Sequence, residues 1–412
     1  MPSAKTTKGS LNEGDEVEAR VAQLWYWEGY FARSGVDLKR HYQPEPLLVT
    51  DLDLLAFDFS PSLRRSKTIG ETKTGAAKPL DRIIWIRGLM ALVGADHAEV
   101  VSKSAPSRRA RDLARGLGVR AQSTKDVERR ELAVDVAAVA ELGSHGATAV
   151  VERTRVHKHC SKDADLERAF WFLRSEVWFL DEVTAAKRLI GTYRVLSKRW
   201  TPYIDDEDSS ALRWLLAETV SAFTLNAVAI AADAITDDAD LFRTELSERL
   251  SGGVVPAAAM RRIAIDVDRF VAGLLSATNA PASLRVDAMG ALQPEPPEWT
   301  DSLIELVHRL AMSPAAAQAL PRQMDLLIFE RLVWRRQVPL AAVQRLELDS
   351  TDAGRLIRLV AAFLRTYSAP IDAVDKALTR PIPTTSVDAA PAGEVAEQAV
   401  AQELPIADSP EV

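Results

Sequence analysis

Apolar residues recur at helical spacing near the start of the chain. The stripe consists of Val17, Val21, Leu24 and Trp25. Spacings of three and four residues place such side chains on one face of a helix, so the pattern predicts an amphipathic helix from Asp15 to Arg33. Gly29 and Tyr30 are the closing residues of this stripe.

Strand and helix patterns alternate between residues 50 and 122. Short apolar or alternating runs predict strands, and apolar residues three or four positions apart predict helices. In chain order the expected elements are strands at 50–58 and 68–74, a helix at 80–93, a strand at 98–102, a helix at 107–117 and a strand at 119–122. Gly94 and Gly118 are the expected helix stops, and Ser104 or Ser107 is the expected cap of the second helix.

Beyond residue 130 the helical period dominates and strand patterns are nearly absent. A helix is expected from Glu131 to Leu142, and the run Gly143-Ser144-His145-Gly146 ends it. The residues after 379 are rich in Pro, Ala, Thr, Ser and Glu, a composition typical of disorder. The expected organisation is a flexible tail at 1–13, an α/β domain at 14–130, a connector at 131–162, a helical domain at 163–378 divided near the proline cluster at 293–297, and a disordered tail at 379–412.

Two pairs of charged residues stand on two of the expected strands. Alternate strand residues share a face, so Asp51 and Asp53 point the same way, and so do Glu71 and Lys73. If the strands pair through the loop from Ser60 to Lys67, two or three carboxylates and one ammonium converge. Carboxylates suit Mg²⁺ or Mn²⁺ rather than zinc, so the pattern favours a metal-dependent phosphodiester-cleaving site. The alternative is a turn cap and the solvent face of an edge strand.

The segments from Thr50 to Asp58 and from Thr68 to Thr74, with the elements around them, resemble the restriction-endonuclease-like PD-(D/E)XK nucleases. The resemblance covers roughly residues 14–126. It implies an α/β core in the order helix, three strands, helix, strand (α-β-β-β-α-β). It also implies hydrolysis of phosphodiester bonds with Mg²⁺ or Mn²⁺ as the cofactor.

The resemblance further implies catalytic roles. Asp53, Glu71 and the carbonyl of Thr72 would hold one or two metal ions, which neutralise the scissile phosphate and lower the pKa of a bound water. Lys73 would orient that water for attack or stabilise the developing charge. The implied catalytic residues are therefore Asp53, Glu71 and Lys73.

Two further acids belong to the same comparison. Glu18 is on the first expected helix, where many members of the family carry an acid, and Asp51 would be auxiliary. Thr50 stands where the family name has proline, so it stays open whether Asp51 or Asp53 is the metal ligand. Asp53 is favoured because the apolar run after it looks like the metal-binding strand of several members.

Charge is divided unevenly along the chain. Residues 1–130 carry 22 Lys and Arg against 17 Asp and Glu, a net charge of +5, whereas the remaining residues carry −12 of the total of −7. Phosphate contacts need cations, so DNA is expected at the basic part. The candidate contacts, in the loop between the two motif strands and on or beside the helix at 107–117, are Arg64, Arg65, Lys67, Arg108, Arg109, Arg111 and Arg115. A solvated arginine-rich surface is the alternative for each.

Cysteine use and hydropathy bear on location. Cys160 is the one cysteine, so no intrachain disulfide can form and a reducing cytoplasm is expected. The first fourteen residues lack the apolar core of a signal peptide. The longest uncharged run, Thr219 to Ala232, is shorter than the roughly 20 residues a membrane-spanning helix needs. We therefore expect a soluble protein without a membrane partner.

Three functions remain in competition. The first is a Mg²⁺-dependent DNA endonuclease, of the restriction or phage-defence type by analogy, whose helical domain binds a target, a protein partner or a second copy. The second is a non-catalytic nucleic-acid-binding or assembly subunit that retains the nuclease fold. The third is an interaction protein whose acidic helical half binds a basic partner. We favour the first and expect its activity to be gated, while the form of the nucleic acid stays open.

Overall fold

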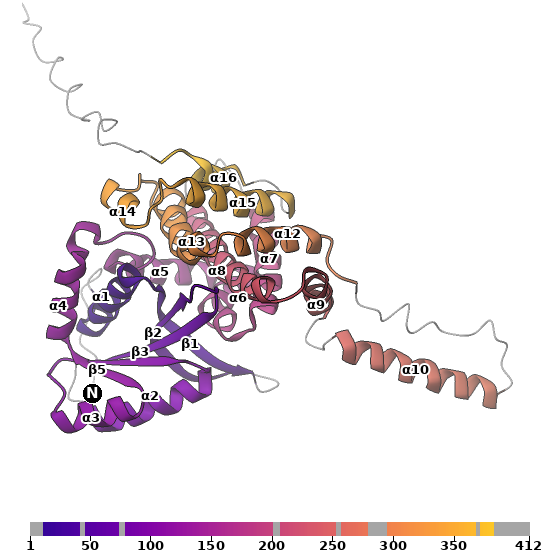
Figure 1. Ribbon diagram of the computed structural model, residues 1–412, viewed down its shortest axis with the longest axis horizontal. Helices are drawn as coiled ribbons and strands as arrows, with labels where there is room; N and C mark the ends of the chain where they lie inside the picture. Colours follow the sequence, from indigo (N-terminus) through magenta and orange to yellow (C-terminus); the bar gives the residue numbers. More distant parts are fainter. Residues whose placement is uncertain are drawn as a thin grey trace, which may run out of the picture.

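The computed structural model describes residues 11–41, 46–73, 79–200, 207–252, 257–278, 295–367 and 371–382. Its N-terminal part contains a five-stranded mixed sheet, and the part that follows is mostly helical (Figure 1). The expected α/β class followed by helices is confirmed at this level. The tails expected at 1–13 and 379–412 lie almost wholly outside the described residues, and so does the start of the proline cluster at 293–297.

The strands of the sheet lie side by side in chain order. They are β1 (Phe31–His41), β2 (Pro46–Phe59), β3 (Arg65–Lys73), β4 (His97–Ser102) and β5 (Val119–Ser123). β1, β2 and β3 are antiparallel neighbours, whereas β3, β4 and β5 are parallel. Each parallel step needs a crossover, and the connecting helices are α2 (Pro79–Val93) and α3 (Arg108–Gly116).

Helices cover both faces of this sheet. Helix α1 (Glu13–Glu28) lies on one face, and α2 and α3 lie on the other (Figure 1). Gly70 of β3 allows α1 to approach closely, because a Cβ at this position would lie 2.7 Å from the Trp25 ring. Ile69 and Glu71, the residues on either side of Gly70, therefore point to the other face, which α2 covers, and so does Lys73.

The boundary between α1 and β1 differs from the expected one. The helix ends at Glu28, and Phe31 to Arg33 belong to β1 and not to the helix. Gly29 has φ +120°, a conformation that residues other than glycine rarely adopt, and its N–H caps the carbonyls of Trp25 and Tyr26. Phe31 and Ala32 are buried strand residues, although the expected helix extends over them.

The first helix after β5 also has other ends than expected. The helix expected from Glu131 to Leu142 is instead α4 (Thr124–Val134), which starts at a Ser123–Asp126 capping box. Asp135 ends it in the left-handed conformation, with φ 49°, and a short 3₁₀ turn, η1 (Val136–Val139), follows. By contrast, α2 and α3 match their expected ranges, with Ser107 as the cap of α3.

The remaining elements are helical, and the described residues after 123 contain no strand. They are α5 (Ala147–Cys160), α6 (Ala164–Arg174), η2 (Glu176–Phe179), α7 (Glu182–Arg199), α8 (Glu207–Thr236), α9 (Ala239–Ser251), α10 (Ala257–Ala277), α12 (Thr300–Ala311), α13 (Pro314–Ile328), the π-helical turn η4 (Phe329–Val333), α14 (Leu340–Arg345), α15 (Thr351–Tyr367) and α16 (Asp372–Thr379). Helix α10 packs chiefly on α9 and leaves Ile263, Phe270 and Leu274 exposed.

Helix α8 is the centre of the helical part. Helices α7, α12 and α13 pack against it. Its segment Ser209–Thr236 is long and apolar enough to cross a membrane, but the apolar window is wholly buried inside the protein. A helix that is apolar on all sides is typical of a protein core when other helices surround it.

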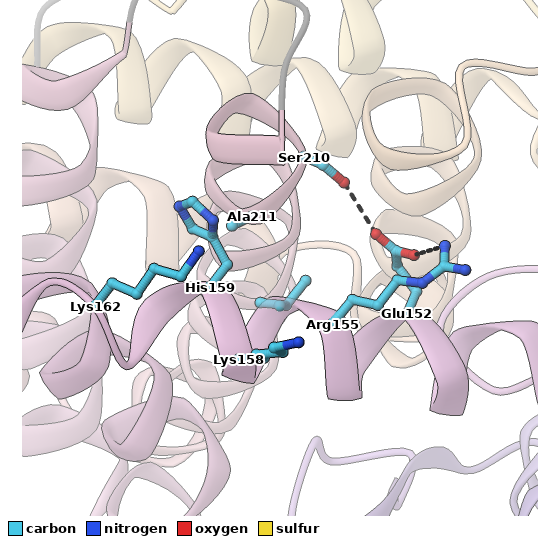
Figure 2. A pocket seen from close by; sticks show the side chains of 8 residues that line it. Glu152, Arg155, Lys158, His159, Lys162, Ser210 and Ala211 are labelled. Atoms are coloured by element: carbon cyan, nitrogen blue, oxygen red, sulfur yellow. Dashed lines mark hydrogen bonds and ion pairs between the residues drawn. The ribbon is translucent and has the colours of Figure 1, made fainter. Parts of the chain in front are cut away.

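The expected connector at 131–162 contains the regular helix α5. This helix packs on α1, α6 and α8. A cavity of about 460 Å³ lies between α5 and the start of α8, and the cationic side chains of Arg155, Lys158 and Lys162 line it (Figure 2). Glu152 lines it as well and accepts hydrogen bonds from Arg155 and Ser210.

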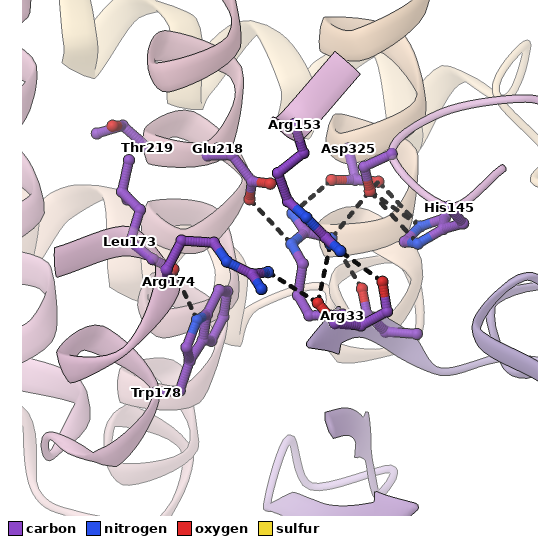
Figure 3. A network of polar contacts seen from close by, with 12 residues as sticks. Arg33, His145, Arg153, Leu173, Arg174, Trp178, Glu218, Thr219 and Asp325 are labelled. Atoms are coloured by element: carbon purple, nitrogen blue, oxygen red, sulfur yellow. Dashed lines mark hydrogen bonds and ion pairs between the residues drawn. The ribbon is translucent and has the colours of Figure 1, made fainter. Parts of the chain in front are cut away.

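A buried ion-pair network joins the sheet to the helical part (Figure 3). Arg33 of β1, with a side chain only 5% exposed, donates to Glu218 of α8 at 2.9 Å and to Asp325 of α13 at 2.7 Å. His145 lies 3.2 Å from the other oxygen of Asp325, and the Ser144 hydroxyl donates to that oxygen at 3.0 Å. The side chains that meet here come from segments up to 292 residues apart in sequence.

The charges in this network depend on one another. Burial alone would raise the pKa of Asp325, but the Arg33 charge and the hydrogen bond from His145 hold that pKa well below its usual range. Burial lowers the pKa of His145. A buried ion left without its partner is strongly destabilising, because neither water nor a counter-charge solvates it.

We predict that Arg33→Met lowers the free energy of unfolding by about 3–5 kcal/mol, because Glu218 and Asp325 both lose their buried cation. Urea unfolding followed by circular dichroism measures the change. The control is Arg309→Met, which removes an exposed pair with Glu305 and should cost less than about 1 kcal/mol. Equal losses in the two variants would contradict a structural role for the network.

Candidate active site

The candidate site forms where β2 and β3 stop pairing. The antiparallel register between these strands extends to Leu54 opposite Gly70. Two residues after Gly70, the backbone N–H of Thr72 donates at 2.7 Å to the side-chain carboxylate of Asp53, the residue before Leu54. β3 meanwhile continues beside β4 as far as Lys73 opposite Ser102. The Asp53 side chain is therefore held in the fork between the two strands.

The fork brings the three implied catalytic residues together. The Lys73 ammonium lies 2.9 Å from Oε1 of Glu71 and 3.7 Å from Oδ2 of Asp53. Asp53 and Glu71 are buried, at 6% and 3% exposure, whereas the Lys73 side chain is 32% exposed. The ammonium is thus the part of the cluster that solvent, or a bound substrate, reaches most easily.

The electrostatics of the cluster favour a further cation. Burial raises the pKa of Asp53, and the Thr72 hydrogen bond and the Lys73 charge oppose that rise only in part. Burial and the Asp53 charge likewise raise the pKa of Glu71. The hydrogen bond and charges of the two acids outweigh burial at Lys73 and raise its pKa, so this residue stays an ammonium.

Glu18 of α1 belongs to the same electrostatic group. Burial first, and then the Asp53 and Asp15 charges, raise the pKa of Glu18 to about 8. The charges of Arg153 and Lys73 act in the opposite direction. The helix-borne acid expected from the sequence therefore feels the charge of the cluster on β2 and β3.

Arg82 is a member of the cluster that sequence analysis missed. Its guanidinium, on the first turns of α2, lies 3.4 Å from Oε1 of Glu71. The sequence offers a signal for Arg82, because a helix that starts soon after a strand holds its first side chains near the end of that strand. Arg153 was also missed, and nothing local could have found it, since it lies on α5, far along the chain from Glu18.

Asp51 stands apart from the cluster. It is exposed and opposite Asp37 of β1. Its effect on the site is electrostatic, because its charge helps to raise the pKa of Asp53. The sequence left open whether Asp51 or Asp53 is the metal ligand. In the structure, the Asp53 carboxylate is the one that lies near the Lys73 ammonium and accepts the Thr72 N–H.

The expected location of Arg65 and Lys67 in a loop is wrong, because both lie on β3. Arg65 donates to Asn226 at 3.2 Å and lies 3.8 Å from Glu182. Lys67 donates to the Val93 carbonyl at 2.9 Å, and burial lowers its pKa to about 8. Both side chains are engaged in internal contacts.

The other candidate phosphate contacts are exposed. Arg64 lies in the short loop before β3. The side chains of Arg108, Arg109, Arg111 and Arg115 are exposed on α3. Arg108 and Arg115 flank Asp112, which offsets part of their charge.

Donor chemistry at the cluster fits a hard divalent cation. Asp53, Glu71 and the Thr72 carbonyl offer oxygen atoms only, and the raised pKa values of both acids mean that a cation would stabilise their charged forms. The described residues contain no group of three or more His, Cys, Asp or Glu side chains placed to hold a metal ion. The run His157-Lys158-His159-Cys160 at the end of α5 is covered by that result, and its Cys160 is fully buried, which raises the pKa of the thiol to about 12.

The comparisons with known proteins add no relative. No family model, curated protein or solved structure matches the chain. The geometry and charges of the site are therefore the basis for inferring a function.

We predict that Glu18→Gln flattens the pH dependence of stability. A folded-state pKa of about 8, against a usual 4.5, means that Glu18 favours folding at low pH and that this contribution is lost as pH rises through about 8. The parent protein should lose stability between about pH 5 and 8, and the variant should lose less. Urea unfolding at several pH values measures this, with the exposed Glu16→Gln as the control. Parallel curves for parent and Glu18→Gln would contradict the assignment.

Proposed function

We propose that the chain is a metal-dependent nuclease that hydrolyses phosphodiester bonds of DNA. The observation that carries the proposal is the convergence of Asp53, Glu71 and Lys73 at the fork between β2 and β3. Two buried carboxylates beside a partly exposed ammonium suit a reaction in which charge develops on a phosphate. The finer fold assignment, a PD-(D/E)XK core in the order α-β-β-β-α-β, is part of the same proposal.

Each residue has a defined task in this proposal. Asp53, Glu71 and the Thr72 carbonyl would hold Mg²⁺ or Mn²⁺, which supplies charge neutralisation and an acidified water. The Thr72 N–H fixes the orientation of Asp53. Lys73 donates to the attacking water or to the phosphate oxygen, which orients the nucleophile and stabilises the developing negative charge.

The second candidate is a non-catalytic nucleic-acid-binding or assembly subunit that keeps this fold. Arg82 favours it, because a second cation beside Glu71 already offsets the charge that a metal would neutralise. The nuclease proposal instead assigns Arg82 to the substrate side, where its partly exposed guanidinium can turn from Glu71 to a phosphate. Metal-dependent cleavage separates the two candidates.

We predict that Lys73→Met lowers the rate of DNA cleavage by at least about 100-fold and leaves DNA affinity within about threefold, because the ammonium acts on the reacting atoms. Single-turnover cleavage with Mg²⁺ and fluorescence anisotropy in EDTA measure the two quantities. A Lys73→Met protein that cuts as fast as the parent would remove the basis of the proposal.

The matched control is Lys103→Met. Lys103 follows β4, and its backbone N–H donates to the Lys73 carbonyl, so it is close in space. Its side chain is 63% exposed and pairs with Glu13 at 2.6 Å, away from Asp53 and Glu71. Its replacement should leave the cleavage rate unchanged.

We predict that the exposed arginines, and not Arg65, set the salt dependence of DNA binding. Arg64→Ala and Arg109→Ala should each reduce the slope of log K against log salt concentration by about one, which is the effect of one lost phosphate contact. Arg65→Ala should leave the slope unchanged and lower the midpoint of thermal unfolding, because it removes the contact with Asn226. The reverse pattern would show that Arg65 contacts DNA.

A further inference from the structure

A second polar cavity, of about 300 Å³, lies on the face of the sheet opposite the catalytic cluster. Its lining includes Trp25, Tyr30, Thr68, Glu99, Gly118, Arg120 and Arg130. A Cβ on Gly70 would point to Trp25 of α1. Thr68 is two residues before Gly70 on the same strand, so its side chain also faces α1. Glu71 and Lys73 lie at the odd-numbered positions of β3, so their side chains point to the opposite face of the sheet. The cavity is therefore separate from the catalytic cluster.

The polar atoms at the base of this cavity are incompletely satisfied. Oε1 of Glu99 accepts hydrogen bonds from Gln122 and, at 2.9 Å, from Arg130. Its other oxygen, Oε2, has Arg120 at 3.7 Å, beyond hydrogen-bond distance. Oγ1 of Thr68, a residue 7% exposed, is buried and has no hydrogen-bond partner. A buried hydroxyl without a partner is unusual and is consistent with a ligand that completes its bonding.

The lining of the cavity is mainly polar, and its accessible aromatic part is the half-buried Tyr30, because Trp25 is only 2% exposed. The Trp25 and Tyr30 rings are 6.1 Å apart at an angle of 44°. Gly118, at φ +70°, would have no heavy atom within 4 Å of an added Cβ, in contrast to the crowded Gly70. One accessible aromatic ring beside convergent polar groups favours a flat ligand with polar edges.

The charged groups around the cavity determine which polar groups the ligand must carry. A carboxylate only accepts hydrogen bonds, so Glu99 needs donors. The Arg130 charge is shared with Glu28, to which it donates at 2.9 Å, so it does not leave a surplus of positive charge for an anion. A neutral ring with adjacent N–H donors satisfies these conditions, and guanine offers its ring N–H and exocyclic amino group side by side.

We propose that this cavity binds a guanine base, with the N–H donors directed to Glu99, the Thr68 hydroxyl bonded to a ring or carbonyl atom and the ring against Tyr30. Adenine fits less well, because it presents an acceptor beside its amino group. The base can come from free guanosine or from a nucleic acid. The proposal stands independently of the nuclease chemistry, since none of these residues belongs to the catalytic cluster.

Isothermal titration calorimetry of the full chain in EDTA tests the proposal, with guanosine and adenosine as probes. We expect guanosine to bind at least about tenfold more tightly than adenosine, the effect of about one lost hydrogen bond to a buried group. Thr68→Val should weaken guanosine binding about fivefold or more. Absence of guanosine binding, or equal affinity for the two nucleosides, would overturn the proposal.

Two further variants separate a site from a change in stability. Arg120→Ala removes a 65% exposed side chain next to Glu99 and should alter guanosine affinity, whereas Arg129→Ala, which removes a 74% exposed arginine of α4, should not. If Arg129→Ala and Arg120→Ala have the same effect, the cavity is not the binding site. Thermal unfolding of each variant verifies that the fold is retained.

Competition by oligonucleotides identifies the source of the base. On the Lys73→Met background, which prevents cleavage in the proposed mechanism, displacement of guanosine by a guanine-containing single strand but not by oligothymidine indicates a base presented by nucleic acid. Guanosine binding without such displacement indicates a free nucleoside. Displacement by both strands to the same extent would contradict recognition of guanine. The catalytic proposal can fail without affecting any of these outcomes.

Discussion

The Arg33 side chain is the contact on which the arrangement of the molecule depends. It extends from the first strand of the sheet to acids on two helices of the C-terminal part, and it is buried with both of them. Next to it, Arg153 and Arg174 donate to the carbonyl of Ser34 and so fix the same strand from two further helices. Because the charge of Arg153 also opposes the rise in the pKa of Glu18, the contact region between the two parts is electrostatically linked to the candidate site.

The candidate site is a local exception to regular strand pairing. Backbone groups of paired strands normally bond to each other, but here the Asp53 carboxylate replaces a strand carbonyl as the acceptor of the Thr72 N–H. That exchange holds an acid in a buried position beside Glu71, where both have raised pKa values. Placing like charges together in a buried site costs stability, so the arrangement is more easily explained by a function than by folding.

Sequence patterns predicted those features that depend on local spacing. The strands with Asp53 and Glu71, helices α2 and α3 and the Ser107 cap all follow from periodicity and capping. Patterns failed where a tertiary contact decides the outcome. Phe31 to Arg33 fall inside the expected first helix but are strand residues, and Arg65 is expected in a loop but pairs with the helical part. The partners of Arg33 are 185 and 292 residues away, a separation that no local pattern encodes.

The proposed nuclease activity depends on the acids and the lysine at the strand fork. The most direct test incubates the parent protein and Glu71→Ala with supercoiled plasmid, linear duplex, single-stranded DNA and RNA, in Mg²⁺, Mn²⁺ or EDTA. We expect cleavage of DNA by the parent with a divalent cation, and none with EDTA or in the variant. Cleavage by the parent in EDTA, or undiminished cleavage by Glu71→Ala, would contradict it. DNA binding without cleavage under every condition would favour the non-catalytic subunit instead.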